Sequence, residues 1–152
     1  MAGTIWEFFG YRAGEKSAKA KESIRKLVCP IINETCEKTF NDRTVSGVCT
    51  IKPITTDPVI CCPIRLYAED YKILHDVSAK AFGGAHPLVP CGEAVSYAKK
   101  EKQPCIAVFG KKWGGELRLP QKSGVGGYFI DWVLAKIDAV GELEEFIAIE
   151  VQ

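Results

Sequence analysis

Four of the five cysteines in one 34-residue stretch are widely spaced, and two of these four directly precede a proline. Six, twelve and twelve residues separate these four, Cys29, Cys36, Cys49 and Cys62. Four thiolates brought together form a tetrahedral site for zinc or iron, because soft sulfur ligands suit these ions. A bound ion would help to fold a segment that has few core-forming apolar runs. The spacing therefore predicts a four-cysteine metal site.

Two alternatives compete with this prediction. The cysteines could be ordinary buried residues, which pack as small hydrophobes, and the tight C-x₂₋₄-C knuckles of common zinc modules are missing. They could also form disulfides, but seven cysteines is an odd count and the N-terminus does not resemble a secretory signal. We expect an intracellular, reducing environment, which disfavours disulfides. Spacing and compartment together favour the metal site.

The fourth ligand has two neighbouring candidates. Cys61 and Cys62 are adjacent, and we prefer Cys62 because it begins the second Cys-Pro pair. Cys91 and Cys105 lie in other predicted elements and are interpreted as core residues.

Composition limits the class of protein. The chain has 152 residues, 47% of them hydrophobic and 26% charged, with a net charge of +1. These values are typical of an ordinary soluble domain, and no apolar run approaches the ~20 residues that span a membrane. We therefore expect no membrane partner, and phosphate binding would have to come from local patches.

Periodicity predicts helices first and strands later, which indicates a mixed α+β fold. Between the first two helices lies the cysteine segment, 29–63, which we expect to be irregular. The expected helices cover 14–28, 66–82 and 92–102, and the expected strands cover 105–110, 115–119, 128–140 and 146–152.

Acidic residues on the predicted strands form a second candidate site. Glu150 and Gln152 must share a face, because side chains alternate along a strand. Asp131 lies among large apolar residues, where a carboxylate is costly unless it is paired or binds a cation. If the strands of Asp131 and Glu150 are neighbours, their oxygens converge in a site suited to Mg²⁺. Alternatively, both carboxylates face solvent, and the pattern alone favours this because D…E-x-Q is a loose motif.

Several motifs in one order resemble the NotI group of type II restriction endonucleases. They are EFFGYR, the Cys-Pro…Cys…GVC…Cys-Pro-x-Arg pattern, GGEL at 114–117, F-x-D-W-x-L-A at 129–135 and the terminal E-x-Q. The resemblance implies a PD-(D/E)xK nuclease core over 66–152, preceded by a four-cysteine element over 1–65 that holds iron. It implies Cys29, Cys36, Cys49 and Cys62 as the ligands of the structural metal. It also implies Mg²⁺-dependent catalysis by Glu116, Asp131, Glu150 and Gln152, with Gln152 in place of the usual lysine.

Partners and location follow from the same resemblance. It implies cleavage of double-stranded DNA at a specific, GC-rich site, by a homodimer in the cytoplasm of a prokaryotic cell. Family members continue well beyond the E-x-Q strand. We therefore expect a truncated or split N-terminal portion that is inactive alone and could act with a separate C-terminal polypeptide.

Two other function classes remain open. One is a non-catalytic module whose four-cysteine metal element binds DNA or another partner. The other is a rubredoxin-like electron carrier, which the missing tight knuckles disfavour.

Overall fold

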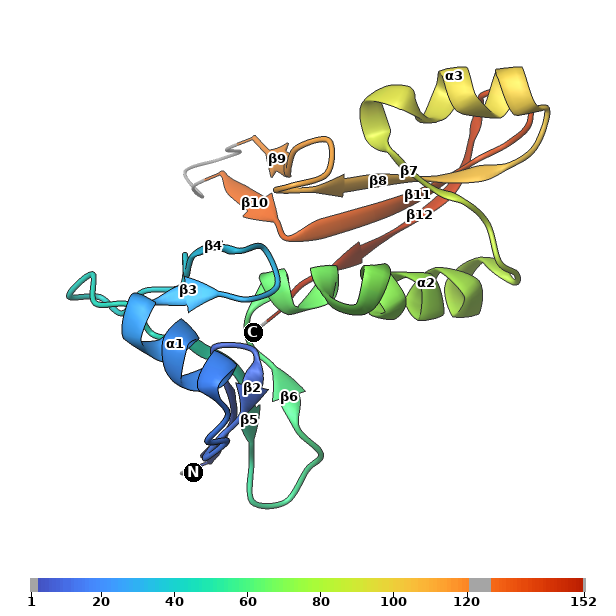
Figure 1. Cartoon of the computed structure of the whole chain (residues 1–152). Coiled ribbons are helices and arrows are strands. Elements are labelled where there is room, and N and C mark those ends of the chain that lie inside the picture. Colours follow the sequence, from blue (N-terminus) through green and yellow to red (C-terminus); the bar gives the residue numbers. More distant parts are fainter. Residues whose placement is uncertain (1–2, 121–126, 152) are drawn as a thin grey trace. The chain divides into compact units, whose positions relative to one another are not determined.

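The computed structural model describes residues 3–120 and 127–151. Over these residues the chain is a mixed α+β protein, as the sequence predicts (Figure 1). It divides into two compact units: unit 1 comprises Met1–Lys72 with Val151–Gln152, and unit 2 comprises Ile73–Glu150. None of the helices in the described part combines the length and apolar character that a membrane crossing needs.

Unit 1 contains a sheet that the sequence did not predict. Its four antiparallel strands lie in the order β2-β1-β5-β6, and a separate hairpin pairs β3 with β4. The segment expected to be irregular therefore contains four short strands. Three of them are only two residues long, which is too short for side-chain alternation to be recognised. The bounds are β1 (Thr4–Phe8), β2 (Tyr11–Arg12), β3 (Val28–Cys29), β4 (Glu34–Thr35), β5 (Val48–Lys52) and β6 (Val59–Ile60).

The first helix is shorter than the predicted span. Helix α1 (Ala18–Lys26) begins where Ser17 caps it, because the Ser17 hydroxyl accepts a hydrogen bond of 3.2 Å from the Ala20 N–H. It ends at Leu27, whose φ of 55° is left-handed. The cap and the left-handed residue fix ends that periodicity alone cannot give.

A 3₁₀ turn, η1 (Pro63–Tyr67), leads into α2 (Ala68–Phe82). Glu69, Asp70 and Tyr71 have φ values between 52° and 60°, so the regular right-handed helix starts after them. The helix predicted over 66–82 is therefore present, with an irregular first turn.

Unit 2 is built on a sheet of order β12-β11-β8-β7. Strands β7 and β8 are parallel and are joined by α3, whereas β8, β11 and β12 are antiparallel. Helix α3 covers one face of this sheet and α2 lies along the other (Figure 1). The predicted strand at 105–110 has its expected bounds. These elements are β7 (Leu88–Pro90), α3 (Cys91–Glu101), β8 (Cys105–Gly110), β11 (Trp132–Ile137) and β12 (Leu143–Ile149).

Small side chains let α3 approach the sheet closely. Cys105 is fully buried, and its thiol donates to the Ala94 carbonyl at 3.4 Å. Cys91 is half-buried and packs against the same core, so both cysteines contribute to the core, as expected. The buried members of this core are Val89, Ala94, Ala98, Cys105, Ala107, Ala135 and Ile137.

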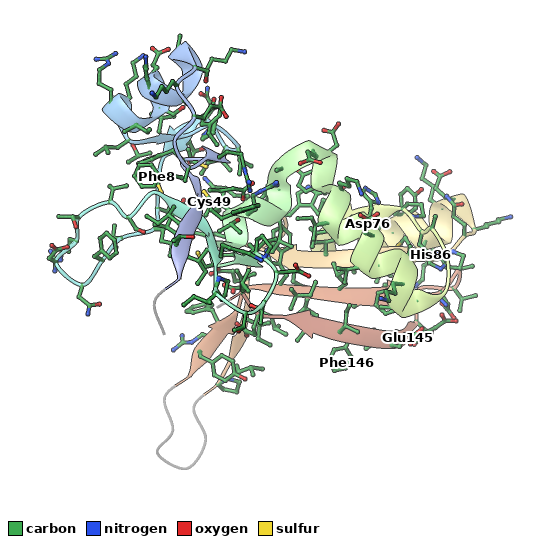
Figure 2. The ribbon with its side chains drawn as sticks, turned by 90° about the horizontal axis from the view of Figure 1, so that it is seen from below. Phe8, Cys49, Asp76, His86, Glu145 and Phe146 are labelled. Atoms are coloured by element: carbon green, nitrogen blue, oxygen red, sulfur yellow. The ribbon has the colours of Figure 1, made fainter. Side chains whose placement is uncertain are left out.

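The prediction of a single strand over 128–140 is wrong. The segment forms two strands, β10 (Tyr128–Ile130) and β11, with a bend at Asp131, because each pairs with different partners. Strand β10 forms a separate hairpin with β9 (Leu117–Leu119). The last predicted strand, 146–152, is displaced to β12, on which Phe146 is exposed (Figure 2).

Candidate functional site

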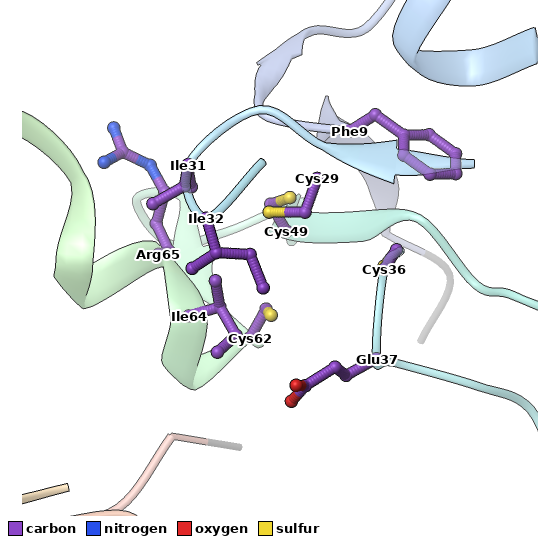
Figure 3. A pocket seen from close by; sticks show the side chains of 10 residues that line it. All are labelled: Phe9, Cys29, Ile31, Ile32, Cys36, Glu37, Cys49, Cys62, Ile64 and Arg65. Carbon is purple, nitrogen blue, oxygen red and sulfur yellow. The ribbon is translucent and has the colours of Figure 1, made fainter. Parts of the chain in front are cut away.

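The four predicted cysteine ligands line one cavity in unit 1. Cys29 ends β3, Cys36 follows β4, Cys49 lies on β5, and Cys62 immediately precedes η1. All four are buried, with at most 9% of each exposed. The cavity they share has a volume of about 10 Å³, comparable to one water-sized sphere (Figure 3). Residues far apart in sequence therefore meet around a space of the size of a single water molecule or ion.

The neighbouring Cys61 does not line this cavity. It is half-buried, and its thiol interacts with the Val48 carbonyl at 3.9 Å. Its N–H donates to the Cys49 carbonyl at 3.0 Å, which holds the chain beside β5 and lets the next residue, Cys62, enter the cavity. The structure thus separates the roles of these two adjacent cysteines.

The remaining walls of the cavity are mainly apolar. They exclude water from the thiols, which would strengthen any charge interaction inside. Across the described residues, however, no group of three or more His, Cys, Asp or Glu side chains has the arrangement of a metal site. The thiols share a cavity without forming a closed set of ligands. The other lining residues are Phe9, Ile31, Ile32, Glu37, Ile64 and Arg65.

Backbone amides already point at two of the sulfur atoms. The Gly10 N–H donates to the Cys49 sulfur at 3.3 Å. Burial raises the pKa of the Cys62 thiol, while a hydrogen bond from the Ile64 N–H and the nearby Lys38 ammonium oppose this rise. Such donors favour a thiolate over a thiol. They are the outer contacts that a cysteine ligand requires.

Burial opposes ionisation more strongly than these donors promote it. The pKa of Cys49 is raised to about 12. Burial is the largest cause, and the other three cysteines contribute to the rise. Burial also raises the pKa of Cys62. Without a cation the Cys49 and Cys62 thiols are therefore neutral, and a cation would have to displace their protons.

An ion pair connects Arg65, which lines the cavity, to Glu7 on β1. Arg65 Nε lies 3.3 Å from Glu7 Oε2, and the Thr50 hydroxyl donates to the same Glu7 oxygen. Arg65 Nη2 also lies 3.4 Å from Glu69 Oε1. Glu7 lies in the EFFGYR motif and Arg65 in the Cys-Pro-x-Arg motif, but no sequence signal indicates that these two residues contact each other.

The three described carboxylates of the second site lie at ends of strands in unit 2. Glu116 immediately precedes β9, Asp131 separates β10 from β11, and Glu150 follows β12. Glu116 and Asp131 are half-buried, whereas Glu150 is exposed. Gln152 lies outside the described residues.

Each of these carboxylates adjoins a residue of a strand pair. Ile130, which precedes Asp131, pairs with Leu117, which follows Glu116. Trp132, which follows Asp131, pairs with Ile149, which precedes Glu150. The strand after Asp131 and the strand before Glu150 are thus neighbours, which is the condition under which the two carboxylates are expected to converge. Among the described residues, these carboxylates do not form a group arranged to hold an ion.

Comparisons with known proteins assign no family. No protein-family model matches the chain, and a search of curated proteins found no match.

Proposed function

We propose that the chain is part of a Mg²⁺-dependent endonuclease that cuts double-stranded DNA, of the NotI type with a PD-(D/E)xK core. The observation that supports the proposal is the position of Asp131 between Ile130, which pairs with the neighbour of Glu116, and Trp132, which pairs with the neighbour of Glu150. Carboxylate oxygens are the ligands that Mg²⁺ prefers. The sequence resemblance assigns catalysis to these same three positions and to Gln152.

In this proposal the acidic residues bind Mg²⁺ and hold it in position. Asp131 and Glu150 would hold Mg²⁺, with Glu116 as a further oxygen ligand. A bound Mg²⁺ supplies a water of lowered pKa and offsets the charge on the leaving oxygen. Asp131 is half-buried, which limits competition from bulk water.

The cysteine cavity would hold iron or zinc in a structural role. Four soft donors, a buried space and amide hydrogen bonds to two sulfur atoms fit such an ion. Cys29, Cys36, Cys49 and Cys62 would bind it, and the ion would contribute folding free energy to unit 1.

A non-catalytic DNA-binding module is the second candidate. It is favoured by the cysteine cavity, which belongs wholly to unit 1 and needs no residue of the carboxylate site. In that case the metal would order a binding surface, and the carboxylates would do no chemistry.

One experiment separates the two candidates. GC-rich plasmid is incubated with the chain in Mg²⁺ or EDTA, with and without the polypeptide encoded directly downstream. The endonuclease proposal predicts discrete fragments that appear only with Mg²⁺. Duplex binding without cleavage in any tube would favour the binding module.

A further inference from the structure

Hairpin β9–β10 lies at one end of the unit 2 sheet (Figure 1), and it exposes aromatic and aliphatic side chains. Tyr128 is 55% exposed and Phe129 is 56% exposed, and Leu117 is also exposed. Large apolar side chains gathered on a small, exposed element commonly mark a binding surface.

One face of this hairpin combines an aromatic ring with a cation. Arg118 and Phe129 are directly paired across the strands, so their side chains leave the same face. The Arg118 guanidinium carbon lies 5.8 Å from the centre of the Phe129 ring, which agrees with this assignment. A guanidinium at that distance is attracted to the ring face and is held near it.

The candidate Mg²⁺ ligands adjoin the same hairpin. Glu116 directly precedes β9 and Asp131 directly follows β10. Between them and the Arg118–Phe129 pair lies one further strand pair, Leu117–Ile130. The Arg118–Phe129 pair therefore lies two residues along the chain from each of the two carboxylates.

We propose that the Arg118–Phe129 pair binds one nucleotide of the DNA strand beside the carboxylate site. Arg118 contacts its phosphate, and the exposed Phe129 ring packs against its sugar or base. The proposal rests on the proposed function, because the carboxylates beside the pair are the candidate Mg²⁺ ligands. Guanidinium groups match phosphate geometry, and exposed aromatic rings stack on nucleotides without reading their sequence.

The carboxylates make this binding depend on a divalent cation. Glu116, Asp131 and Glu150 would repel a neighbouring phosphate, and a bound cation would offset their charge. Arg118 supplies an attraction of its own at the edge of that site. The pair would thus position the substrate without taking part in bond cleavage.

The test measures fluorescence anisotropy of a labelled GC-rich duplex with the intact chain in Ca²⁺, over a range of salt concentrations. Arg118→Gln should weaken binding about tenfold and reduce the slope of log affinity against log salt by about 0.9. Phe129→Leu should weaken binding about fivefold or more with the slope unchanged, because it removes stacking but no charge. Lys80→Gln, which removes an exposed cation from the last turn of α2, is the control and should change little.

The outcomes separate this proposal from the nuclease. Mg²⁺ binding is measured by calorimetry, and Arg118→Gln should leave it unchanged. Mg²⁺ binding that requires Asp131, with duplex affinity indifferent to Arg118, would overturn this proposal and keep the nuclease. Duplex affinity that requires Arg118, in a chain that binds no Mg²⁺, would support the pair as a DNA contact and count against the nuclease. No duplex binding by the intact chain at low salt would also overturn this proposal.

Discussion

Arg65 and Glu7 are 58 residues apart in sequence, yet their charged groups lie 3.3 Å apart with less than a fifth of either side chain exposed. The pair joins η1 to β1, and both elements adjoin the cysteine cavity. Ion pairs shielded from water are more sensitive to loss of one partner than surface pairs. We therefore expect this ion pair to stabilise unit 1.

Glu7→Gln should lower the free energy of unfolding by about 1–2 kcal/mol, because Arg65 would lose its charged partner while a similar shape remains. Glu22→Gln is the control, since its pair with Lys26 is more than half exposed. That change should have little or no effect on the free energy of unfolding, because solvent screens exposed ion pairs. Urea unfolding followed by tryptophan fluorescence measures both. If the two substitutions lowered the free energy of unfolding equally, the stabilising role of the Glu7–Arg65 pair would be contradicted.

The metal prediction can be tested with two adjacent residues. Cys62→Ser should lose the bound iron or zinc, because Cys62 lines the cavity. Cys61→Ser should keep it, because Cys61 lies outside the lining. Elemental analysis of protein purified without chelator gives the ion content per chain. Retention of the ion by Cys62→Ser, or less than a tenth of an ion in the unaltered protein, would refute the assignment.

Removal of the ion should make stability depend on alkaline pH. The pKa of Cys49 is raised in the folded chain from its ordinary value of 9.0 to about 12, chiefly by burial. A raised pKa contributes stability below pH 9, and this contribution is lost as the pH rises toward 12. The metal-free chain should therefore lose stability over this range more steeply than its Cys49→Ser variant. Urea unfolding with chelator at pH 8, 9 and 10 measures the difference, and parallel curves would contradict the prediction.

Two glycines distinguish backbone strain from crowding at the cavity. Gly47 and Gly14 both have left-handed φ angles, of 68° and 86°. A Cβ on Gly47 would overlap the Phe9 ring, whereas nothing lies within 4 Å of one on Gly14. Gly14→Ala should cost about 1 kcal/mol from strain alone. Gly47→Ala should cost about 2 kcal/mol or more and reduce the metal content. Similar losses in unfolding experiments would exclude crowding as the cause.

Sequence could predict elements whose signal is local. The run CIAVFG gives β8 its bounds, and the periodic segments give the bodies of α2 and α3. The break at Asp131 has no local signal, because apolar residues continue on both sides of it. It arises from pairing with different strands, which only the folded chain specifies. The strands of unit 1 are too short for a periodic pattern, and their pairing depends on contacts between distant residues.

The sites divide in the same way. Cysteine spacing and the second Cys-Pro pair were enough to select four residues that share a cavity. The contact between Glu7 and Arg65, and the amides that point at sulfur, depend on tertiary packing and were not predicted. For the carboxylates, the sequence supplied the residue types, and the register supplied the central position of Asp131. The Arg118–Phe129 pair lacked a sequence signal, because its meaning depends on cross-strand pairing.

The position of Asp131 leads to the sharpest prediction for the nuclease. Asp131→Asn keeps the size of the side chain but removes the charge at the point where the registers of both strand pairs meet. It should abolish Mg²⁺ binding measured by calorimetry and abolish any Mg²⁺-dependent cleavage, while duplex affinity in EDTA is retained or increased, because a repelling charge is gone. Glu150→Gln should act in the same direction.

Glu93→Gln provides the control for this substitution, because Glu93 is an exposed acid in the first turn of α3. It removes one negative charge from the same unit and should leave Mg²⁺ binding unchanged. If the control and Asp131→Asn weaken Mg²⁺ binding equally, the ion responds only to the general charge of unit 2. If Asp131→Asn binds Mg²⁺ and cuts like the unaltered protein, Asp131 is not a ligand, and the proposed catalytic site is wrong.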